Sequence, residues 1–161
     1  MSMKIDIEKK QIIKIQIKKI GIVLISMLAT FMIAMGPIAK VDGFNVLPWL
    51  DIPFHIWGGF LLGMLGVRII TLLESNIKDS DGILNIDKLE YAYKYLLLIV
   101  VFVMFWGFTW EVWEYWMYIT HRSVNWGGIL DTCKDLFDDM LGAVLSYIYT
   151  LKKVSKNKGY I

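Results

Sequence analysis

The stretch from Tyr95 to Ile119, YLLLIVVFVMFWGFTWEVWEYWMYI, decides the fold of this chain. Glu111 and Glu114 are the only charged residues within it. An α-helix needs roughly 20 mostly apolar residues to cross about 30 Å of hydrocarbon, and this stretch is longer than that. It therefore predicts a membrane-spanning helix with two carboxyl groups near one end.

Three further apolar stretches are predicted to lie in the membrane, at about residues 20–39, 53–73 and 136–151. The last is expected to be the inner part of a helix that begins near Gly128. Asp87 and Glu90 have the spacing of a capping box, so the helix of the 95–119 span is expected to begin before it enters lipid. The expected fold class is all-α, a polytopic membrane protein built as a four-transmembrane-helix bundle.

Composition agrees with this fold and excludes other classes of protein. Hydrophobic residues make up 57% of the chain, more than a soluble domain normally contains. The net charge of +2 is too small to indicate nucleic-acid binding. Cys133 is the only cysteine, which argues against a thiol-based metal or redox site. A cleaved signal peptide is the alternative for the first span, but its basic region and apolar core are long for one.

The distribution of lysine and arginine predicts the orientation in the membrane. The side expected in the cytoplasm carries Lys4, Lys9, Lys10, Lys14, Lys18, Lys19, Arg68, Lys78, Lys88, Lys94, Lys152, Lys153, Lys156 and Lys158. The other side has only Lys40, Arg122 and Lys134. The positive-inside rule places both termini in the cytoplasm. We expect a basic arm at residues 1–19, either lying on anionic headgroups or solvated, a membrane domain at 20–151 and a basic tail at 152–161.

Acidic residues gather at the opposite, extracytoplasmic end of the spans. They are Asp42, Asp51, Glu111, Glu114, Asp131, Asp135, Asp138 and Asp139, with His55 and His121 nearby. An ionised group inside a span costs a few kcal/mol unless it is paired, coordinated or hydrated, so these residues indicate a functional site.

Helical periodicity predicts that these side chains meet. Asp131, Asp135 and Asp138 share one sector of the last helix, with Asp139 beside it, and Asp51 and His55 are spaced i, i+4. Each of three spans has a glycine one turn deeper, namely Gly59, Gly107 and Gly142. Small residues let membrane helices approach closely, and Gly59 and Gly63 extend such a surface.

Two kinds of chemistry fit such a cluster. Carboxylates with one imidazole suit a divalent cation such as Mg²⁺, Mn²⁺ or Zn²⁺. The candidate ligands are Glu111, Glu114, Asp131, Asp135, Asp138 and Asp139. The alternative is a structural hydrogen-bonded network that includes Arg122, Lys134 and tyrosines.

All seven tryptophans fall at or near the predicted outer half of the membrane. An aromatic belt at the membrane interface explains most of them. A few could line a pocket for a lipid chain or stack on a sugar, and Trp110 and Trp113 are the candidates for substrate contact. Asp51 and Arg122 complete the predicted substrate-binding set.

Three motifs stand out: Asp51-x-x-x-His55-x-x-Gly58, Glu111-x-x-Glu114 and Asp131-Thr132-x-x-Asp135-Leu136-x-x-Asp139-x-x-Gly142-Ala143. They resemble the motifs of small bacterial membrane proteins of the VanZ-like and YjdF-like groups. The resemblance covers about residues 48–145. Those groups usually read Asp-Lys-x-x-His in the first motif, whereas Ile52 follows Asp51 here. The VanZ name attaches to low-level glycopeptide resistance. The resemblance implies a bacterial cell membrane.

Two hypotheses for function follow. In the first, the protein does not catalyse a reaction: it binds an envelope lipid, glycopeptide or partner protein, with or without a divalent cation. In the second, it is a metal-dependent enzyme acting on a lipid-linked or phosphate-containing envelope substrate, with His55 and Glu111 as catalytic residues. An ion or proton carrier would need ionisable residues along the whole membrane depth, and the spans offer few below the outer layer.

Overall fold

The protein is all-helical in a computed structural model that describes residues 2–34, 48–76, 89–121 and 127–158. Four long helices form the fold: α1 (Ser2–Ile33), α3 (Asp51–Asn76), α4 (Leu89–His121) and α5 (Ile129–Lys158). A single 3-10 turn, η2 (Pro48–Leu50), leads into α3. Each predicted span lies largely on one helix, and α5 begins beside Gly128, as expected. Asp87 of the predicted capping box lies outside the described residues.

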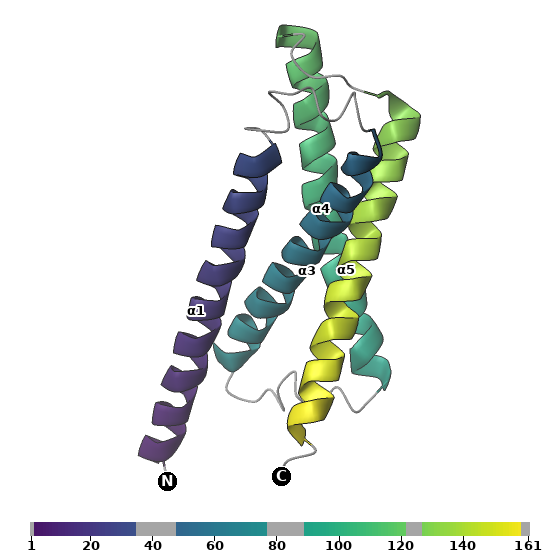
Figure 1. Ribbon diagram of the computed structural model, residues 1–161. Helices are drawn as coiled ribbons and strands as arrows, with labels where there is room; N and C mark the ends of the chain where they lie inside the picture. Colours follow the sequence, from purple (N-terminus) through teal and green to yellow (C-terminus); the bar gives the residue numbers. More distant parts are fainter. Residues whose placement is uncertain (1, 35–47, 77–88, 122–126, 159–161) are drawn as a thin grey trace.

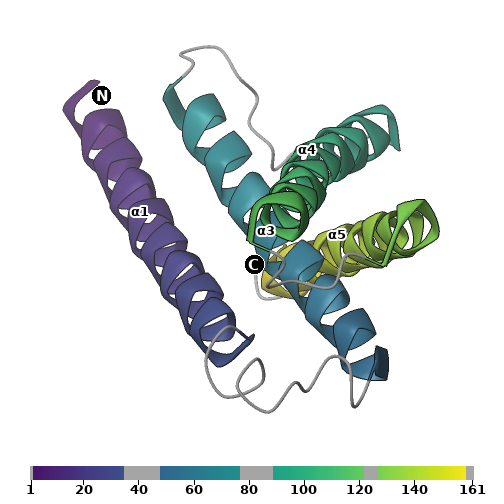
Figure 2. The same cartoon turned by 90° about the horizontal axis from the view of Figure 1, so that it is seen from above.

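The helices alternate in direction along the chain, so that α1 begins and α5 ends at the same end of the bundle (Figure 1). Helix α3 lies between α1 on one side and the pair of α4 and α5 on the other (Figure 2). Alternation makes α3 and α5 parallel neighbours, and both begin at the end of the bundle away from the termini. The polar residues near the start of α3 are thereby placed beside those near the start of α5.

Glycines bring α3 and α5 into backbone contact. A Cβ atom added to Gly59 would collide with the backbone of Asp139, and one added to Gly142 would collide with the backbones of Ile56 and Phe60. One turn further along, a Cβ atom added to Gly63 would collide with the side chain of Ser146. These contacts confirm the prediction that small residues let the helices approach closely.

The hydrophobic core lies deeper in the bundle, among α3, α4 and α5. Val67, Ile99, Val103, Ala143 and Tyr147 form its buried cluster. Helix α1 contributes no residue to this cluster. Instead α1 packs along α3, where Trp57 Nε1 donates a hydrogen bond to Thr30 Oγ1. Phe31 of α1 also meets the ring of Trp110 on α4 edge-on. The core of the fold is therefore a three-helix unit with α1 at its side.

Three helices of the described residues are long and apolar enough to cross a membrane. The apolar segments are Ile13–Ile33, Asp51–Leu73 and Tyr93–Thr120. Large apolar side chains point outward along all of them, among them Leu28, Leu98, Phe105 and Phe108. Outward-facing apolar side chains along whole helices are expected where the surrounding solvent is lipid. Helix α5, with acidic residues in its first half, is not among the three.

The predicted basic arm ends at residue 19, and helix α1 continues across that boundary into the first span. It begins at Ser2 and runs without a break to Ile33, so the basic arm and the first span share one helix. Ile15 and Ile17 are exposed on it. Residues 35–39 of the predicted first span lie outside the described residues.

Candidate functional site

Lys134 on α5 joins carboxylates from two helices. Its Nζ atom lies 2.9 Å from Oδ2 of Asp51 on α3, 2.9 Å from Oδ1 of Asp135 and 3.1 Å from Oδ1 of Asp131. Lys134 donates hydrogen bonds to Asp51 and Asp131. The contact to Asp135 Oδ1 is an ion pair outside hydrogen-bonding geometry, so that oxygen has no hydrogen-bond donor among the described residues. Lys134 is thus the positive centre of the site.

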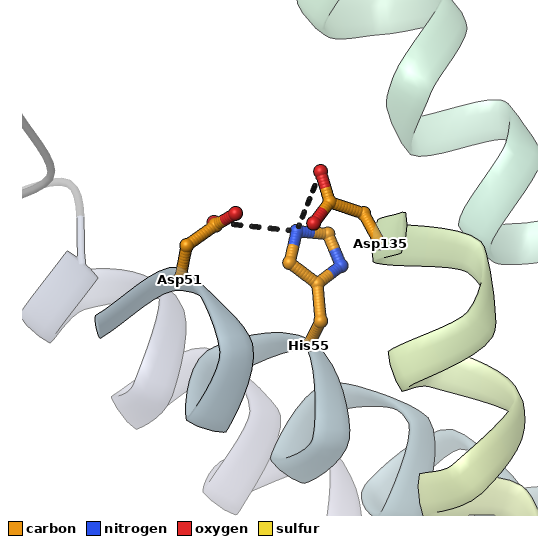
Figure 3. A group of neighbouring side chains, drawn as sticks. All are labelled: Asp51, His55 and Asp135. Carbon is orange, nitrogen blue, oxygen red and sulfur yellow. Dashed lines mark ion pairs between the residues drawn. The ribbon is translucent and has the colours of Figure 1, made fainter. Parts of the chain in front are cut away.

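His55 lies between the same two carboxylates, as Figure 3 shows for Asp51, His55 and Asp135. Its Nε2 atom is 3.5 Å from Asp51 Oδ1 and 3.8 Å from Asp135 Oδ2. Each of the two aspartates therefore turns one oxygen toward Lys134 and the other toward His55. The Asp51 contact confirms the predicted i, i+4 pair at the start of α3.

Asp139 holds the other side of the imidazole ring. Its Oδ1 atom lies 3.4 Å from His55 Nδ1. A Cβ atom on Gly59 of α3 would meet the Asp139 backbone, and one on Gly107 of α4 would meet its carboxylate. Asp139 is therefore buried where α3, α4 and α5 meet. Helical periodicity predicts Asp139 beside the acidic stripe of α5, and the structure places it within the interface of the three helices.

Glu111 connects α4 to the same end of α5. Its Oε2 atom accepts a hydrogen bond from Thr132 Oγ1 at 2.8 Å. Glu111 is only 5% exposed, and its buried Oε1 atom has no hydrogen-bond partner within the part of the chain that the structure describes. The same holds for the buried Oδ2 atom of Asp138. A buried carboxylate oxygen with no donor costs free energy, which is consistent with a site that takes up a cation or a donor group.

Electrostatics keep Lys134 protonated. Burial lowers the pKa of Lys134, but its contacts with Asp135, Asp51 and Asp131 raise it by more, so the net shift is upward. The side chain is 38% exposed, whereas that of Asp135 is 4% exposed. Lys134 can therefore move toward solvent, while Asp135 cannot.

Asp51, His55 and Asp135 form a group that fits a metal ion. One ligand atom from each residue lies within 4.8 Å of the other two. Neighbouring ligand atoms around a tetrahedral Zn²⁺ are about 3.4 Å apart, given bonds of about 2.1 Å. The 3.5 Å and 3.8 Å separations at His55 Nε2 are close to that value and longer than a good N–H to O hydrogen bond. Asp139 at Nδ1 is placed as the carboxylate that orients a metal-bound histidine.

The structure brings together only part of the predicted site. Asp51, His55, Asp131, Asp135 and Asp139 meet around Lys134. Glu114 accepts a hydrogen bond at 2.8 Å from Trp110 on its own helix, and Trp110 packs against Trp113 with ring centroids 4.8 Å apart. Trp110 thus joins Glu114 and Trp113 along α4. Arg122 lies outside the described residues, as do the side chain of His121, Lys40 and Asp42.

Lys134 is the residue that sequence reasoning left out of the site, naming it only as part of the alternative network. One signal pointed to it. Where the resembling groups have a lysine after the first aspartate, this chain has Ile52, so Asp51 needed a cation from elsewhere. The structure supplies that cation from α5.

Comparison with known proteins agrees with the membrane character of the helices. A family model described as "Predicted membrane protein (DUF2238)" matches residues 10–156. That range includes all of the contacts described above. No curated protein and no solved structure matches the chain.

Proposed function

The chain belongs to this family of predicted membrane proteins, and we propose that it is a binding protein of the bacterial cell membrane. It crosses the bilayer four times, with both termini in the cytoplasm. Its extracytoplasmic end carries a site for a divalent cation, formed by Asp51, His55 and Asp135. The bound cation, with Lys134, attracts an anionic group of an envelope lipid, a glycopeptide or a partner protein.

The arrangement of side chains on α5 supports a fourth span. Asp135, Asp138 and Asp139 are buried against the other helices, whereas Phe137, Leu141 and Leu145 are exposed. The acidic residues that make α5 less apolar than the other helices therefore face the bundle interior, which is where charged residues of membrane helices lie. With 30 residues, α5 is about 45 Å long, enough to cross the bilayer.

The orientation follows from charge. Lysines and arginines are concentrated at the end of the bundle where α1 begins and α5 ends, and the positive-inside rule puts that end in the cytoplasm. The cluster around Lys134 lies at the start of α3 and of α5, at the opposite end. It is consequently accessible from the extracytoplasmic side.

The observation that carries the binding site is the position of His55 between Asp51, Asp135 and Asp139. Asp139 faces Nδ1, which leaves Nε2 directed at the two oxygens that complete the ligand set. Imidazole favours Zn²⁺ over Mg²⁺ and Mn²⁺, so we expect affinity in the order Zn²⁺, Mn²⁺, Mg²⁺. Binding requires Lys134 to leave Asp51 and Asp135, and the exposed Asp131 gives its ammonium another partner.

The geometry supports binding more than catalysis. Both nitrogens of His55 face carboxylates, and its side chain is only 11% exposed, which leaves little room for a substrate beside it. Glu111 is held by Thr132. The enzyme hypothesis would require these two residues to reach a substrate directly.

Metal analysis of the full chain purified in mild detergent tests the proposal. We expect one Zn²⁺ per chain after dialysis against micromolar Zn²⁺, measured by inductively coupled plasma mass spectrometry. His55→Gln and Asp135→Asn should lose the ion, because each removes a ligand. Glu114→Gln is the matched control and should retain it, because Glu114 pairs with Trp110 and lies outside the ligand group.

Two results would contradict this assignment. A wild-type protein with no bound ion would leave the cluster a purely structural network. Loss of the ion in Glu114→Gln as well, with normal helicity and elution volume in all variants, would place the ligands elsewhere. Release of phosphate from a lipid diphosphate by the zinc-loaded protein would favour the enzyme hypothesis instead.

A further inference from the structure

A second polar cluster, made of Lys19, Arg68 and Lys153, lies at the other end of the bundle. Because α1 and α3 pack antiparallel, the heights of Lys19 and Arg68 in the bundle can be compared. The side chain of Trp57 on α3 donates a hydrogen bond to Thr30 on α1. Lys19 precedes Thr30 by 11 residues on α1, and Arg68 follows Trp57 by 11 residues on α3. Because the two helices are antiparallel, Lys19 and Arg68 lie at the same height.

The parallel packing of α3 on α5 brings Lys153 to that height too. Thr150 Oγ1 contacts Met64 Sδ at 3.9 Å. Arg68 follows Met64 by one turn, and Lys153 follows Thr150 by about one turn (68 − 64 = 4 and 153 − 150 = 3). Lys19 experiences the positive charges of both Arg68 and Lys153. Three helices thus contribute one cation each to a single layer.

This basic cluster has no anionic partner among the described residues. No ion pair there joins Lys19, Arg68 or Lys153 to a carboxylate. Lys153 Nζ instead lies 5.7 Å from the ring centroid of Tyr149. Arg68 is partly buried, and its buried Nε atom has no hydrogen-bond partner in the described ranges. A buried guanidinium group with an unused donor is costly, and an anion at this point would remove that cost.

The height of the cluster matches one face of a bilayer. Arg68 follows Asp51 by 17 residues on α3, or about 25 Å along the helix axis. The two clusters are therefore separated by roughly the thickness of the hydrocarbon core. Exposed apolar side chains lie beside the basic cluster on the side that faces the acidic cluster, among them Ile22 on α1 and Ile148 on α5.

We propose that Lys19, Arg68 and Lys153 bind the phosphate group of an anionic phospholipid in the cytoplasmic leaflet. The guanidinium group of Arg68 suits phosphate because it offers several donors in a fixed plane. A lipid fits better than free phosphate, because its acyl chains can lie along the exposed apolar faces of α1 and α5 while its headgroup reaches the three cations.

Native mass spectrometry of the full chain in mild detergent tests this site. We expect the protein to retain phosphatidylglycerol in preference to phosphatidylcholine. Arg68→Gln and Lys153→Gln should each weaken retention about fivefold, and the double variant about 25-fold, given the usual contribution of one basic residue near an anionic surface. Lys152→Gln is the matched control, because it removes the same charge from an exposed neighbouring position. It should change retention less than about twofold.

Equal retention of phosphatidylglycerol by the wild type and a folded double variant would overturn the proposal. Folding is checked by far-UV circular dichroism and elution volume, and Lys153→Gln alters an exposed side chain that the core does not need. Displacement of the lipid by millimolar inorganic phosphate would identify the ligand as a soluble anion and overturn the assignment to a lipid.

Discussion

Lys134 and a metal ion would compete for the same two carboxylates, Asp51 and Asp135. Replacing the lysine by methionine keeps much of the side-chain volume and removes the competing charge. We expect Lys134→Met to bind Zn²⁺ at least about tenfold more tightly than the wild type, measured by isothermal titration calorimetry. Weaker binding in this variant would mean that the ammonium group helps to hold the ligand.

The same substitution has the opposite effect on the metal-free protein. Without Lys134, the carboxylate of Asp135 keeps its burial, loses its 2.9 Å ion pair and retains the longer contact to His55 at 3.8 Å. We expect the apo form of Lys134→Met to be about 1–3 kcal/mol less stable than the wild type, and added Zn²⁺ to restore its thermal midpoint. Unchanged stability of the apo variant would show that Asp135 is compensated by another group.

Asp139 acts on the site through His55. Asp139→Asn keeps the size of the side chain against Gly59 and Gly107 but removes the charge that faces Nδ1. We expect zinc affinity to fall roughly tenfold, because orienting partners of metal-bound histidines typically contribute that much or more. The bound stoichiometry should stay at one ion per chain. A complete loss of binding would make Asp139 a direct ligand.

Helical spacing predicted the pairs that lie on one helix and the meeting of His55 with the acidic residues of α5, but not which atoms pair across the helices. Asp51 and His55 follow from their i, i+4 spacing, and the burial of Asp135 and Asp138 follows from the acidic stripe of α5. The partners of Lys134 and Asp139 depend on how α3 and α5 are rotated relative to each other. Periodicity within one helix carries no information on that rotation.

At the scale of helices, Gly59 and its neighbour Gly58 offer a matched pair of substitutions. A Cβ atom at Gly59 would collide with the backbone of Asp139, while one at Gly58 would have nothing within 4 Å. We expect Gly59→Ala to destabilise the protein by about 3 kcal/mol or more, because backbone atoms cannot move aside as a side chain can. Gly58→Ala should be neutral or stabilising by up to about 1 kcal/mol, since alanine favours the helix.

Unfolding in detergent micelles, followed by far-UV circular dichroism, measures both variants. Similar stability of the two would show that α3 and α5 are not in backbone contact. Zinc binding should decrease in Gly59→Ala alone, because the ligands come from both helices.

The sequence located all four helices but not all of their ends. Runs of apolar residues gave the spans, and Gly128 marked the start of α5. The first helix extends far back into the basic arm, because isoleucines and lysines alternate there without a glycine or proline to end it. Such a segment is compatible with a solvated arm, a surface helix or a continuous one, and composition does not distinguish them.

Cys133 provides a test of orientation for the whole molecule. It is exposed near the start of α5 and is the only cysteine in the chain. If that end of the bundle is extracytoplasmic, a membrane-impermeant maleimide should label the wild type in intact cells. A Cys133→Ala, Lys10→Cys variant should react only after permeabilisation, because Lys10 lies near the start of α1. The reverse pattern would invert the topology.

The overall arrangement was less predictable than the membrane character. Four apolar spans and alternating directions follow from the sequence, but several packings satisfy both. Contacts between α3 and its neighbours determine the packing. The glycines of α3 face α5, and Trp57 faces α1. Which face of α3 meets which partner depends on packing between distant residues, and no local pattern encodes it.

The parallel placement of α3 and α5 has a consequence for biosynthesis. The ribosome makes α3 and α4 before α5, so Asp51, His55 and Glu111 reach the bilayer before Thr132, Lys134 and Asp139 do. During that interval the nascent helices hold polar groups without the partners they will later have. Arrival of α5, the least apolar of the four long helices, supplies these partners and completes the cluster.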